Sequence, residues 1–252
     1  MKRTLIFITL LCCAATICHA ISYANETLTY RVMYKWGLIN KQAGAVKINI
    51  HSAGDNYAAS LTAASQPWAD KIFRVRDTLT STIAKSNLQP SLYVKNSHEG
   101  SEDKHDVVKF TRKGATVVGD CVRRVHKKGK LTTDEKRQVS AAGTTVDMLS
   151  SFYYLRALKF DTWKQGQVLT INIFSGKSKE RLTFKYRGIE TIELNEKKHP
   201  CYHVTFIFTG DDGTKTSDDM DAWISTDAAR IPLKLEGELP IGKVQCFYTG
   251  KL

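Results

Sequence analysis

Strict alternation of apolar and polar residues is the feature that most constrains the fold of this chain. In the stretch RLTFKYR, residues 181–187, Leu182, Phe184 and Tyr186 alternate with polar side chains. The stretches VLTINIF and AVKINI, residues 168–174 and 45–50, repeat this pattern. Successive side chains of a strand point to opposite faces, so each stretch predicts an antiparallel strand with one buried and one wet face.

Further strands are predicted along the rest of the chain, and turn-forming sequences separate them. These strands are expected at residues 27–35, 57–63, 107–111, 115–118, 202–209, 221–225, 231–236 and 243–248. Their spacing is typical of a meander, sandwich or barrel rather than of βαβ units. We therefore expect an all-β, mainly antiparallel fold: a large meander sheet curled into a barrel-like or sandwich shape, which also protects strand edges.

One segment departs from the two-residue period. In TTVDMLSSFYYLR, residues 144–156, Met148, Phe152 and Leu155 recur at helical spacing. Thr144 or Thr145 is predicted to cap this helix, and Asp147 is expected in its first turn. Ser150, Tyr154 and Arg156 are expected toward its wetter side. In an all-β chain, one short internal helix near residues 145–158 is expected to close the sheet from inside.

The first residues, MKRTLIFITLLCCAATICHA, are typical of an export signal. A positively charged start precedes an apolar run over residues 5–17, and Ala20 offers a small residue for cleavage. Cleavage after Ala24 and an uncleaved anchor are the alternatives. We expect a signal peptide at residues 1–20 and a single β-rich domain at residues 21–252, because no Pro-rich or Gly/Ser-rich linker divides the remainder.

Three cysteines remain after the signal: Cys121, Cys201 and Cys246. An odd number excludes a fully paired disulfide framework. A bridge between Cys201 and Cys246 and two buried free thiols both stay open as interpretations. The spacing of the three does not match a zinc site.

The chain is basic, with 37 Lys and Arg against 25 Asp and Glu. The run RRVHKKGK, residues 123–130, lies in a predicted polar insertion that continues to Arg137. It is a candidate for peripheral contact with an anionic membrane surface, and a solvated hairpin is the alternative. We expect no nucleic-acid partner, because the chain is predicted to be exported and lacks interleaved aromatic residues.

No motif predicts a catalytic residue, a metal site or a cofactor. The serines of DMLSSF lack the glycines of a nucleophile elbow, and the acidic run at residues 210–223 lacks the alternating spacing of a calcium loop. Charges embedded in apolar strands are instead candidates for orienting a polar ligand, although such Arg and Asp residues also pair to brace strand ends. The candidate ligand-binding residues are Arg76, Asp77, Tyr153, Arg156, Trp223, Asp227 and Arg230.

Several of these residues lie in four stretches, FRVRD, DMLSSFYYLR, GIETI and AWISTDAARIPLKLEGELPIG. In this order the stretches resemble an exported bacterial family catalogued as domain of unknown function 3108, over roughly residues 30–248. Its helix motif, D-x-L-S-x-F-Y-x-x-R, is matched by Asp147, Leu149, Ser150, Phe152, Tyr153 and Arg156. Its late motif, W-x-S-x-D-x-x-R-x-P, is matched by Trp223, Ser225, Asp227, Arg230 and Pro232. The resemblance implies a periplasmic location in Gram-negative bacteria and a YmcC-like fold, an antiparallel sheet rolled around a helix, and it supplies no catalytic residues.

Three functions are consistent with these features. The first is a non-enzymatic, chaperone-like or binding protein of envelope biogenesis that holds a lipid-like amphiphile or a glycan. The second is a hydrolase of an envelope polymer that uses paired carboxylates such as Asp77 and Asp227. The third is a structural subunit that docks onto an envelope protein partner in a membrane complex.

Overall fold

A computed structural model describes residues 23, 25–217, 219–239 and 241–250. The predicted signal peptide at residues 1–20 lies outside the described residues. None of the described helices is long and apolar enough to cross a membrane.

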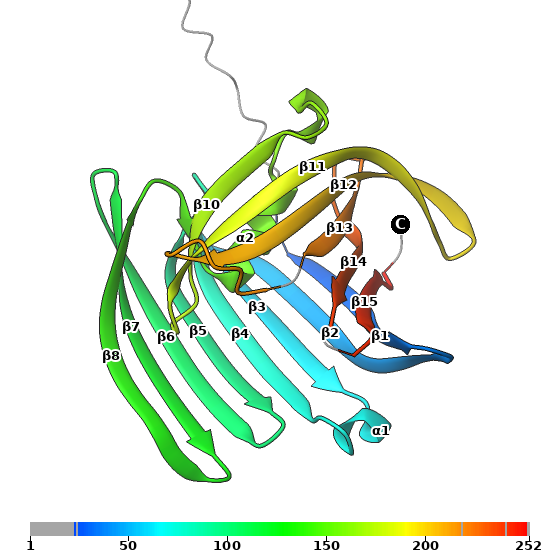
Figure 1. Ribbon diagram of the computed structural model, residues 1–252. Coiled ribbons are helices and arrows are strands. Elements are labelled where there is room, and N and C mark those ends of the chain that lie inside the picture. The colour runs from blue at the N-terminus through cyan, green and yellow to red at the C-terminus, as the bar shows by residue number, and fades with distance from the viewer. Residues whose placement is uncertain (1–22, 24, 218, 240, 251–252) are drawn as a thin grey trace, which may run out of the picture.

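The described residues form one fifteen-stranded sheet that curls into a nearly closed, barrel-like shape (Figure 1). Its strands are β1 (Glu26–Trp36), β2 (Ile39–Ala53), β3 (Asn56–Ser65), β4 (Val75–Ala84), β5 (Pro90–Glu99), β6 (Glu102–Lys113), β7 (Thr116–Lys127), β8 (Lys130–Ala142), β9 (Thr145–Val146), β10 (Val168–Phe174), β11 (Lys179–Leu194), β12 (Lys197–Gly210), β13 (Met220–Ser225), β14 (Pro232–Glu238) and β15 (Lys243–Tyr248). The predicted all-β, mainly antiparallel, barrel-like fold is confirmed.

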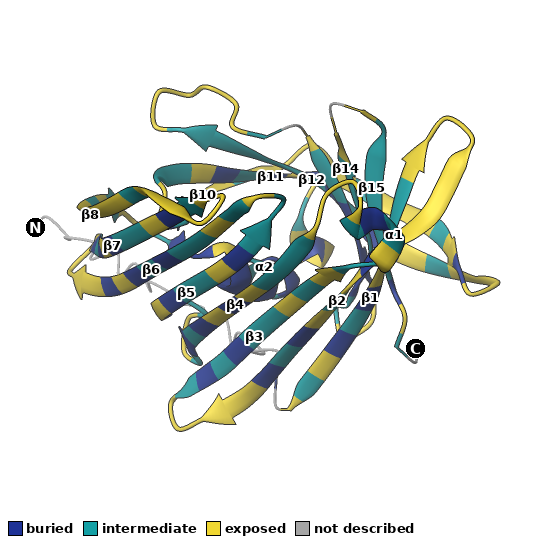
Figure 2. Ribbon diagram, turned by 90° about the horizontal axis from the view of Figure 1, so that it is seen from below, coloured by how far each residue is buried: buried dark blue, intermediate teal, exposed yellow. Residues whose placement is uncertain are grey.

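Two meanders make up this sheet. Strands β1 to β8 are neighbours in chain order, as are β9 to β15, and the antiparallel pairing of β1 with β15 joins the two halves. The short pairing of β9 with β10 is parallel. Buried and exposed residues alternate along β2 to β7 (Figure 2), as expected for strands with one inner and one outer face.

Helix α2 (Met148–Arg156) lies inside the curl, and α1 (Pro67–Asp70) and the 3-10 turn η1 (Phe160–Thr162) are the other helical elements in the described chain. Leu149 and Tyr153 of α2 pack into an apolar cluster that includes inner residues of β1 to β7. Leu155 packs into a second cluster with residues of β10 to β13. The predicted internal helix is therefore confirmed, and its two sides link the two halves of the sheet.

The cap of α2 was predicted wrongly. Asp147, not a threonine, is the N-cap: its Oδ1 accepts from the backbone N–H groups of Leu149 and Ser150 at 2.8 and 2.7 Å, and its Oδ2 accepts from Ser81 Oγ at 2.6 Å. Thr145 belongs to β9, where pairing with β10 keeps it extended. The predicted wetter side was wrong for Ser150 and Arg156, which are fully buried, whereas Tyr154 is half-buried and Met148 is exposed.

Strands β4, β5 and β8 were missing from the prediction because polar residues occupy many positions on both of their faces. The short strand β9 and the helical turns α1 and η1 were not predicted either. The basic run at residues 123–130 is the β7–β8 hairpin, so it belongs to the sheet and is no insertion. Cys121, Cys201 and Cys246 are free thiols, and strands β13 and β14 separate the strands of the latter two.

Candidate functional site

Arg156, at the last turn of α2, forms a buried clamp. Its guanidinium donates to both carboxylate oxygens of Glu26, at 2.6 and 2.8 Å, and to the carbonyl oxygens of Ala229 and Arg230, at 2.8 and 3.0 Å. It also lies over the ring of Tyr23, 4.8 Å from the centroid. These contacts use four of the five N–H donors of an arginine. Arg156 thus ties the helix to β1 and to the β13–β14 loop.

Asp227 and Arg230 brace that same loop. Asp227 Oδ1 accepts from Ser225 Oγ at 2.9 Å and from the backbone N–H of Ala229 at 3.0 Å, as in an Asx turn. The Arg230 guanidinium donates to Asp161 at 3.1 Å and stacks over the ring of Tyr202. The two side chains thus brace the loop through separate partners, and no ion pair among the described residues joins Asp227 to an arginine.

Arg76 and Asp77 are adjacent in β4 and point to opposite faces of the sheet. Arg76 donates to both carboxylate oxygens of Asp70 in α1, at 3.0 and 2.6 Å. Asp77 points inward, directly opposite Ser97 of β5. No hydrogen bond or ion pair within the described residues joins Asp77 to Asp227, the carboxylate suggested as its catalytic partner.

Trp223 is enclosed by its own chain. His203 stacks on its ring at 4.7 Å, with an angle of 9° between the planes, and Lys234 Nζ lies 4.0 Å from the ring centroid. The indole N–H donates to Glu190 at 3.0 Å. Because both neighbours cover the ring, Trp223 offers little open surface to a ligand.

Asp77 instead belongs to a group of charged and hydroxyl side chains on the inner face of β4 to β7. This inner polar cluster comprises Asp77, Tyr93, Lys95, Ser97, Glu99, Lys104, Asp106 and Arg123. Two rows of directly opposed residues build it: Asp77, Ser97 and Lys104 in one, Lys95, Asp106 and Arg123 in the other. Antiparallel register places each row on one face of the sheet.

Ion pairs run through the inner polar cluster. Glu99 accepts from Lys95 at 2.9 Å and from Lys104 at 2.8 Å. Arg123 Nη1 donates to both oxygens of Asp106, at 2.8 and 3.0 Å. Solvent exposure differs across the cluster: Asp106 is fully buried, whereas the Lys95 and Glu99 side chains are about one quarter exposed. Solvent therefore reaches the cluster at one end.

The carboxylates of the cluster differ in acidity. Burial raises the pKa of Asp77 to about 6, against the opposing attraction of Lys95. Burial also opposes ionisation of Glu99, but hydrogen bonds from Lys104 and Lys95 outweigh it and lower the pKa of Glu99 to about 2. For Asp106, burial outweighs the nearby Arg123 guanidinium and raises the pKa.

Several buried polar atoms around the cluster have no hydrogen-bond partner within the described part of the chain. In the cluster itself these atoms are Asp77 Oδ1, Tyr93 Oη and Ser97 Oγ. The hydroxyls of Tyr30 and Tyr153, elsewhere in the protein interior, also lack a partner there. Buried polar atoms are nearly always paired in folded proteins. Unpaired groups on adjoining strands therefore indicate a place where a polar ligand can bind.

The loop between β10 and β11, residues 175–178, covers the buried side of the cluster. Gly176 is buried in this loop with a φ of +88°, and a Cβ on it would stand 2.7 Å from the Cβ of Asp106. Only glycine allows both this backbone conformation and this approach. The second meander of the sheet thus reaches across to close the site formed by the first.

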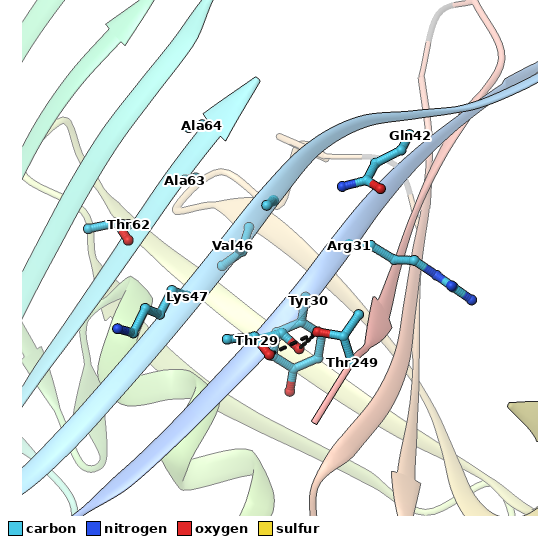
Figure 3. Close-up of a pocket in the computed structure, with 11 residues that line it drawn as sticks. Thr29, Tyr30, Arg31, Gln42, Val46, Lys47, Thr62, Ala63, Ala64 and Thr249 are labelled. Atoms are coloured by element: carbon cyan, nitrogen blue, oxygen red, sulfur yellow. Dashed lines mark hydrogen bonds between the residues drawn. The ribbon is translucent and has the colours of Figure 1, made fainter. Parts of the chain in front are cut away.

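A separate pocket of about 530 Å³ lies mainly on the outer face of β1, β2 and β3 (Figure 3). Small side chains, including Ala45 and Ala64, line it together with Arg31, Gln42 and Lys47. Two of its three threonines, Thr29 and Thr249, hydrogen-bond to each other at 2.8 Å. Their mutual pairing leaves this open depression a weaker candidate than the inner polar cluster.

Sequence reasoning found Asp77 but missed the other members of the inner polar cluster. A usable signal was present in β5, where Tyr93, Lys95, Ser97 and Glu99 occupy alternate positions. The described residues contain no group of three or more His, Cys, Asp or Glu side chains that could hold a metal ion.

Comparison with known families decides the relationship of the chain. The family model described as "Protein of unknown function (DUF3108)" matches residues 29–247. The chain belongs to this family. No curated protein matches the sequence significantly.

One solved structure shares the fold of this DUF3108 family member. A β-barrel-like protein of domain of unknown function DUF1849 from Brucella abortus is similar with a TM-score of 0.61 and 10% identity, over 90% of this chain and 96% of that chain. A "putative lipoprotein" from Parabacteroides distasonis matches 90% of this chain and 95% of that chain, with 6% identity and a TM-score of 0.34. At 10% identity the Brucella structure supports the fold alone.

Proposed function

We propose that this protein is a non-enzymatic periplasmic binding protein of envelope biogenesis, and that its inner polar cluster holds a glycan or the glycan head group of an amphiphile. The observation that carries the proposal is the set of unpartnered buried atoms at Asp77, Tyr93 and Ser97. The predicted export signal supports a location where envelope glycans are present.

The chemistry of the cluster suits a sugar. Hydroxyls of Tyr93 and Ser97 both donate and accept, and the Asp77 carboxylate accepts, which matches the mixed donor and acceptor character of sugar hydroxyls. Three carboxylates face three cationic side chains in the cluster. This balance favours a neutral polar ligand over a strongly charged one.

Packing in the rest of the interior also favours a polar ligand. Helix α2 occupies the middle of the curl, where Leu149 and Tyr153 are fully buried in the apolar cluster. The side chains with unused hydrogen-bonding capacity are therefore the groups that a ligand would satisfy.

Calorimetric titration of the purified protein tests the proposal, with two uncharged probes: a disaccharide of N-acetylglucosamine and a phosphate-free hexose oligosaccharide. We expect one of them to bind, and Ser97→Ala or Asp77→Asn to weaken it by about tenfold, since each removes a group that the ligand would pair. Thr78→Ala, on the outer face of the same strand, is the matched control and should bind normally. Equal affinity in the cluster variants and the control, or no binding of either probe, would refute the proposal.

A second candidate function is hydrolysis of such a glycan. Asp77, with a pKa near 6, and Glu99, with a pKa near 2, are neighbouring carboxylates whose surroundings separate their acidities, as in a general acid and its ionised partner. Mass spectrometry of the same probes after incubation distinguishes the two functions. Cleavage that Asp77→Asn abolishes without abolishing binding would identify a hydrolase, whereas intact probes support the binding protein.

A further inference from the structure

Exposed large apolar side chains gather at one end of the strands. In an antiparallel meander, alternate turns lie at the same end, so the β1–β2 turn, the α1 segment between β3 and β4, the β7–β8 turn and the β14–β15 turn share one end of the sheet. Figure 1 shows the first three along the lower edge of the molecule. The side chains on these turns are Trp36, Leu38, Ile39, Ile72, Phe73, Leu131, Leu239 and Ile241, eight of the twelve exposed large hydrophobics among the described residues.

Contacts join three of these turns directly, and the β5–β6 turn connects them to the β7–β8 turn, since the backbone N–H of Lys128 donates to the Ser101 carbonyl and that of Gly100 to the Arg74 carbonyl, at 2.9 and 2.8 Å. Tyr34 Oη donates to the carbonyl oxygen of Ile241 at 3.0 Å, which links the β1–β2 and β14–β15 hairpins. Trp68 of α1 donates to the carbonyl oxygen of Gln42 at 2.7 Å, which links α1 to β2. Lys41 Nζ lies 4.8 Å from the centroid of the Trp68 ring.

Basic residues flank every apolar tip of this surface. The turns read KWGLINK at residues 35–41, KIFR at 71–74, KKGKL at 127–131 and, ending the β14–β15 turn, a lysine at 243. The acidic residues at this end are paired: Asp70 of α1 with Arg76, and Glu99 and Glu102 beside the β5–β6 turn with Lys104 and Lys127. Within the described chain, Lys35, Lys71, Arg74, Lys128 and Lys130 form no ion pair. We name this set of turns the apolar–basic rim.

The opposite end of β1 to β8 has a different composition. Its turns, at residues 54–55, 85–89, 114–115 and 143–144, carry no exposed large apolar side chain, and Leu92, near the β4–β5 turn, is the one such residue outside the rim among the described residues of β1 to β8. The contrast between the two ends of the same strands excludes a general excess of surface hydrophobics as the cause of the rim.

We propose that the apolar–basic rim docks the protein onto a bilayer that contains anionic phospholipids. Apolar tips would enter the interfacial region, while the lysines and arginine would contact lipid phosphates. The apolar residues are divided among four turns and separated by cations, whereas a protein interface has an apolar centre depleted in charge. A fluid, negatively charged lipid surface therefore fits the rim better than a protein partner. This proposal goes beyond the glycan-binding function and does not rest on it.

Docking through this rim would have a structural consequence for the inner polar cluster. Glu99 and Lys104 flank the β5–β6 turn, which lies at the same end of the sheet as the rim. The solvent-exposed side of the cluster would then face the membrane surface.

Vesicle flotation tests the proposal with protein purified from the periplasm of its expression host and with its N-terminus determined. We expect binding to phosphatidylcholine vesicles that contain about one third phosphatidylglycerol, weaker binding to pure phosphatidylcholine, and release by raised salt. The double variant Leu38→Ser, Phe73→Ser should bind at least about tenfold more weakly, since two exposed apolar anchors are lost.

The matched control is the double variant Val168→Ser, Ile189→Ser, which removes two apolar side chains of comparable exposure away from the rim. It should float like the wild type. A vesicle-dependent blue shift of tryptophan emission that Trp36→Phe abolishes would place the rim in the interface independently of folding. Absence of wild-type binding to the anionic vesicles, or an equal loss in the rim and control variants, would overturn the proposal, and soluble glycan titration would be unaffected by either outcome.

Discussion

Arg156 and Asp77 are charged residues inside the same curled sheet, yet their surroundings differ. The Arg156 guanidinium makes four hydrogen bonds to Glu26 and to two backbone carbonyls. Asp77 Oδ1 is buried without a partner. Removing a buried charge that is paired leaves its partners unsatisfied and destabilises the fold, whereas a buried carboxylate oxygen without a hydrogen-bond partner already lowers stability. The comparison separates a structural clamp from a candidate binding group.

The largest expected effect is at the clamp. Arg156→Ala leaves the Glu26 carboxylate and two backbone carbonyl oxygens without their hydrogen-bond donors. We therefore expect the free energy of unfolding to fall by about 3–5 kcal/mol. Urea denaturation measures this loss, and Glu26→Gln provides a milder variant that stays folded. A loss below about 1 kcal/mol for Arg156→Ala would contradict the structural role. Weaker glycan binding by folded Glu26→Gln would instead extend the binding site to this clamp.

The opposite end of α2 should respond next most strongly. Asp147→Ala removes the N-cap of the helix and the acceptor of the buried Ser81 hydroxyl, with an expected loss of about 2–3 kcal/mol. Asp147→Asn keeps one acceptor oxygen and should lose less. Thermal unfolding of the two variants checks this order, and equal losses would show that the carboxylate charge matters more than the cap.

Gly176 tests the loop that covers the inner polar cluster. Gly176→Ala introduces a Cβ against Asp106 and requires a side chain at a φ of +88°, so we expect a loss of about 2 kcal/mol together with weaker glycan binding. Gly129 also has positive φ, but open space surrounds it, so Gly129→Ala should lose no more than about 1 kcal/mol and bind normally. Identical behaviour of the two variants would argue against close packing of the loop on the cluster.

Asp77 should show the smallest effect on stability and the opposite sign. Burial raises its pKa from 3.8 to about 6. Its protonated form is therefore favoured by the fold, and the stabilisation from this group is complete below pH 3.8 and lost as pH rises through 6. Asp77→Asn should be more stable than wild type by about 1 kcal/mol at neutral pH.

Unfolding free energies across this pH range measure the difference, which should vanish near pH 3.8. Asp147 also has a pKa raised to about 6. The Asp77→Asn variant therefore keeps the part of the wild-type pH dependence that comes from Asp147. A variant less stable than wild type at neutral pH would mean that Asp77 is a structural partner, which would remove the contrast with Arg156.

Local sequence pattern predicted much of the architecture. Alternation in stretches such as RLTFKYR identified strands that the structure contains, and the helical spacing of Phe152 and Leu155 located α2. The cap was placed wrongly because both Thr145 and Asp147 are good capping residues, and only the pairing of Thr145 with Asn172 assigns it to β9. Strands β4, β5 and β8 were missed because their inner faces also carry polar residues.

The candidate site was accessible to prediction only in part. Asp77 was recognisable as a charge within an apolar stretch, but Arg156 was expected at a wetter position and is instead 1% exposed. Its burial depends on Glu26, which lies 130 residues away in the sequence. Sequence spacing carries no information about a partner at that distance.

By itself, the sequence determined that this protein is a curled antiparallel sheet with one internal helix, and that it is a member of its family, because those properties follow from local periodicity and from motifs. Tertiary structure alone decided that Asp77, Ser97 and Lys104 form one row and that Gly176 closes over Asp106. The physical reason is register: a shift of one residue in any strand would turn its polar side chains to the opposite face. Pairing between strands, which no single stretch encodes, therefore determines where the functional chemistry lies.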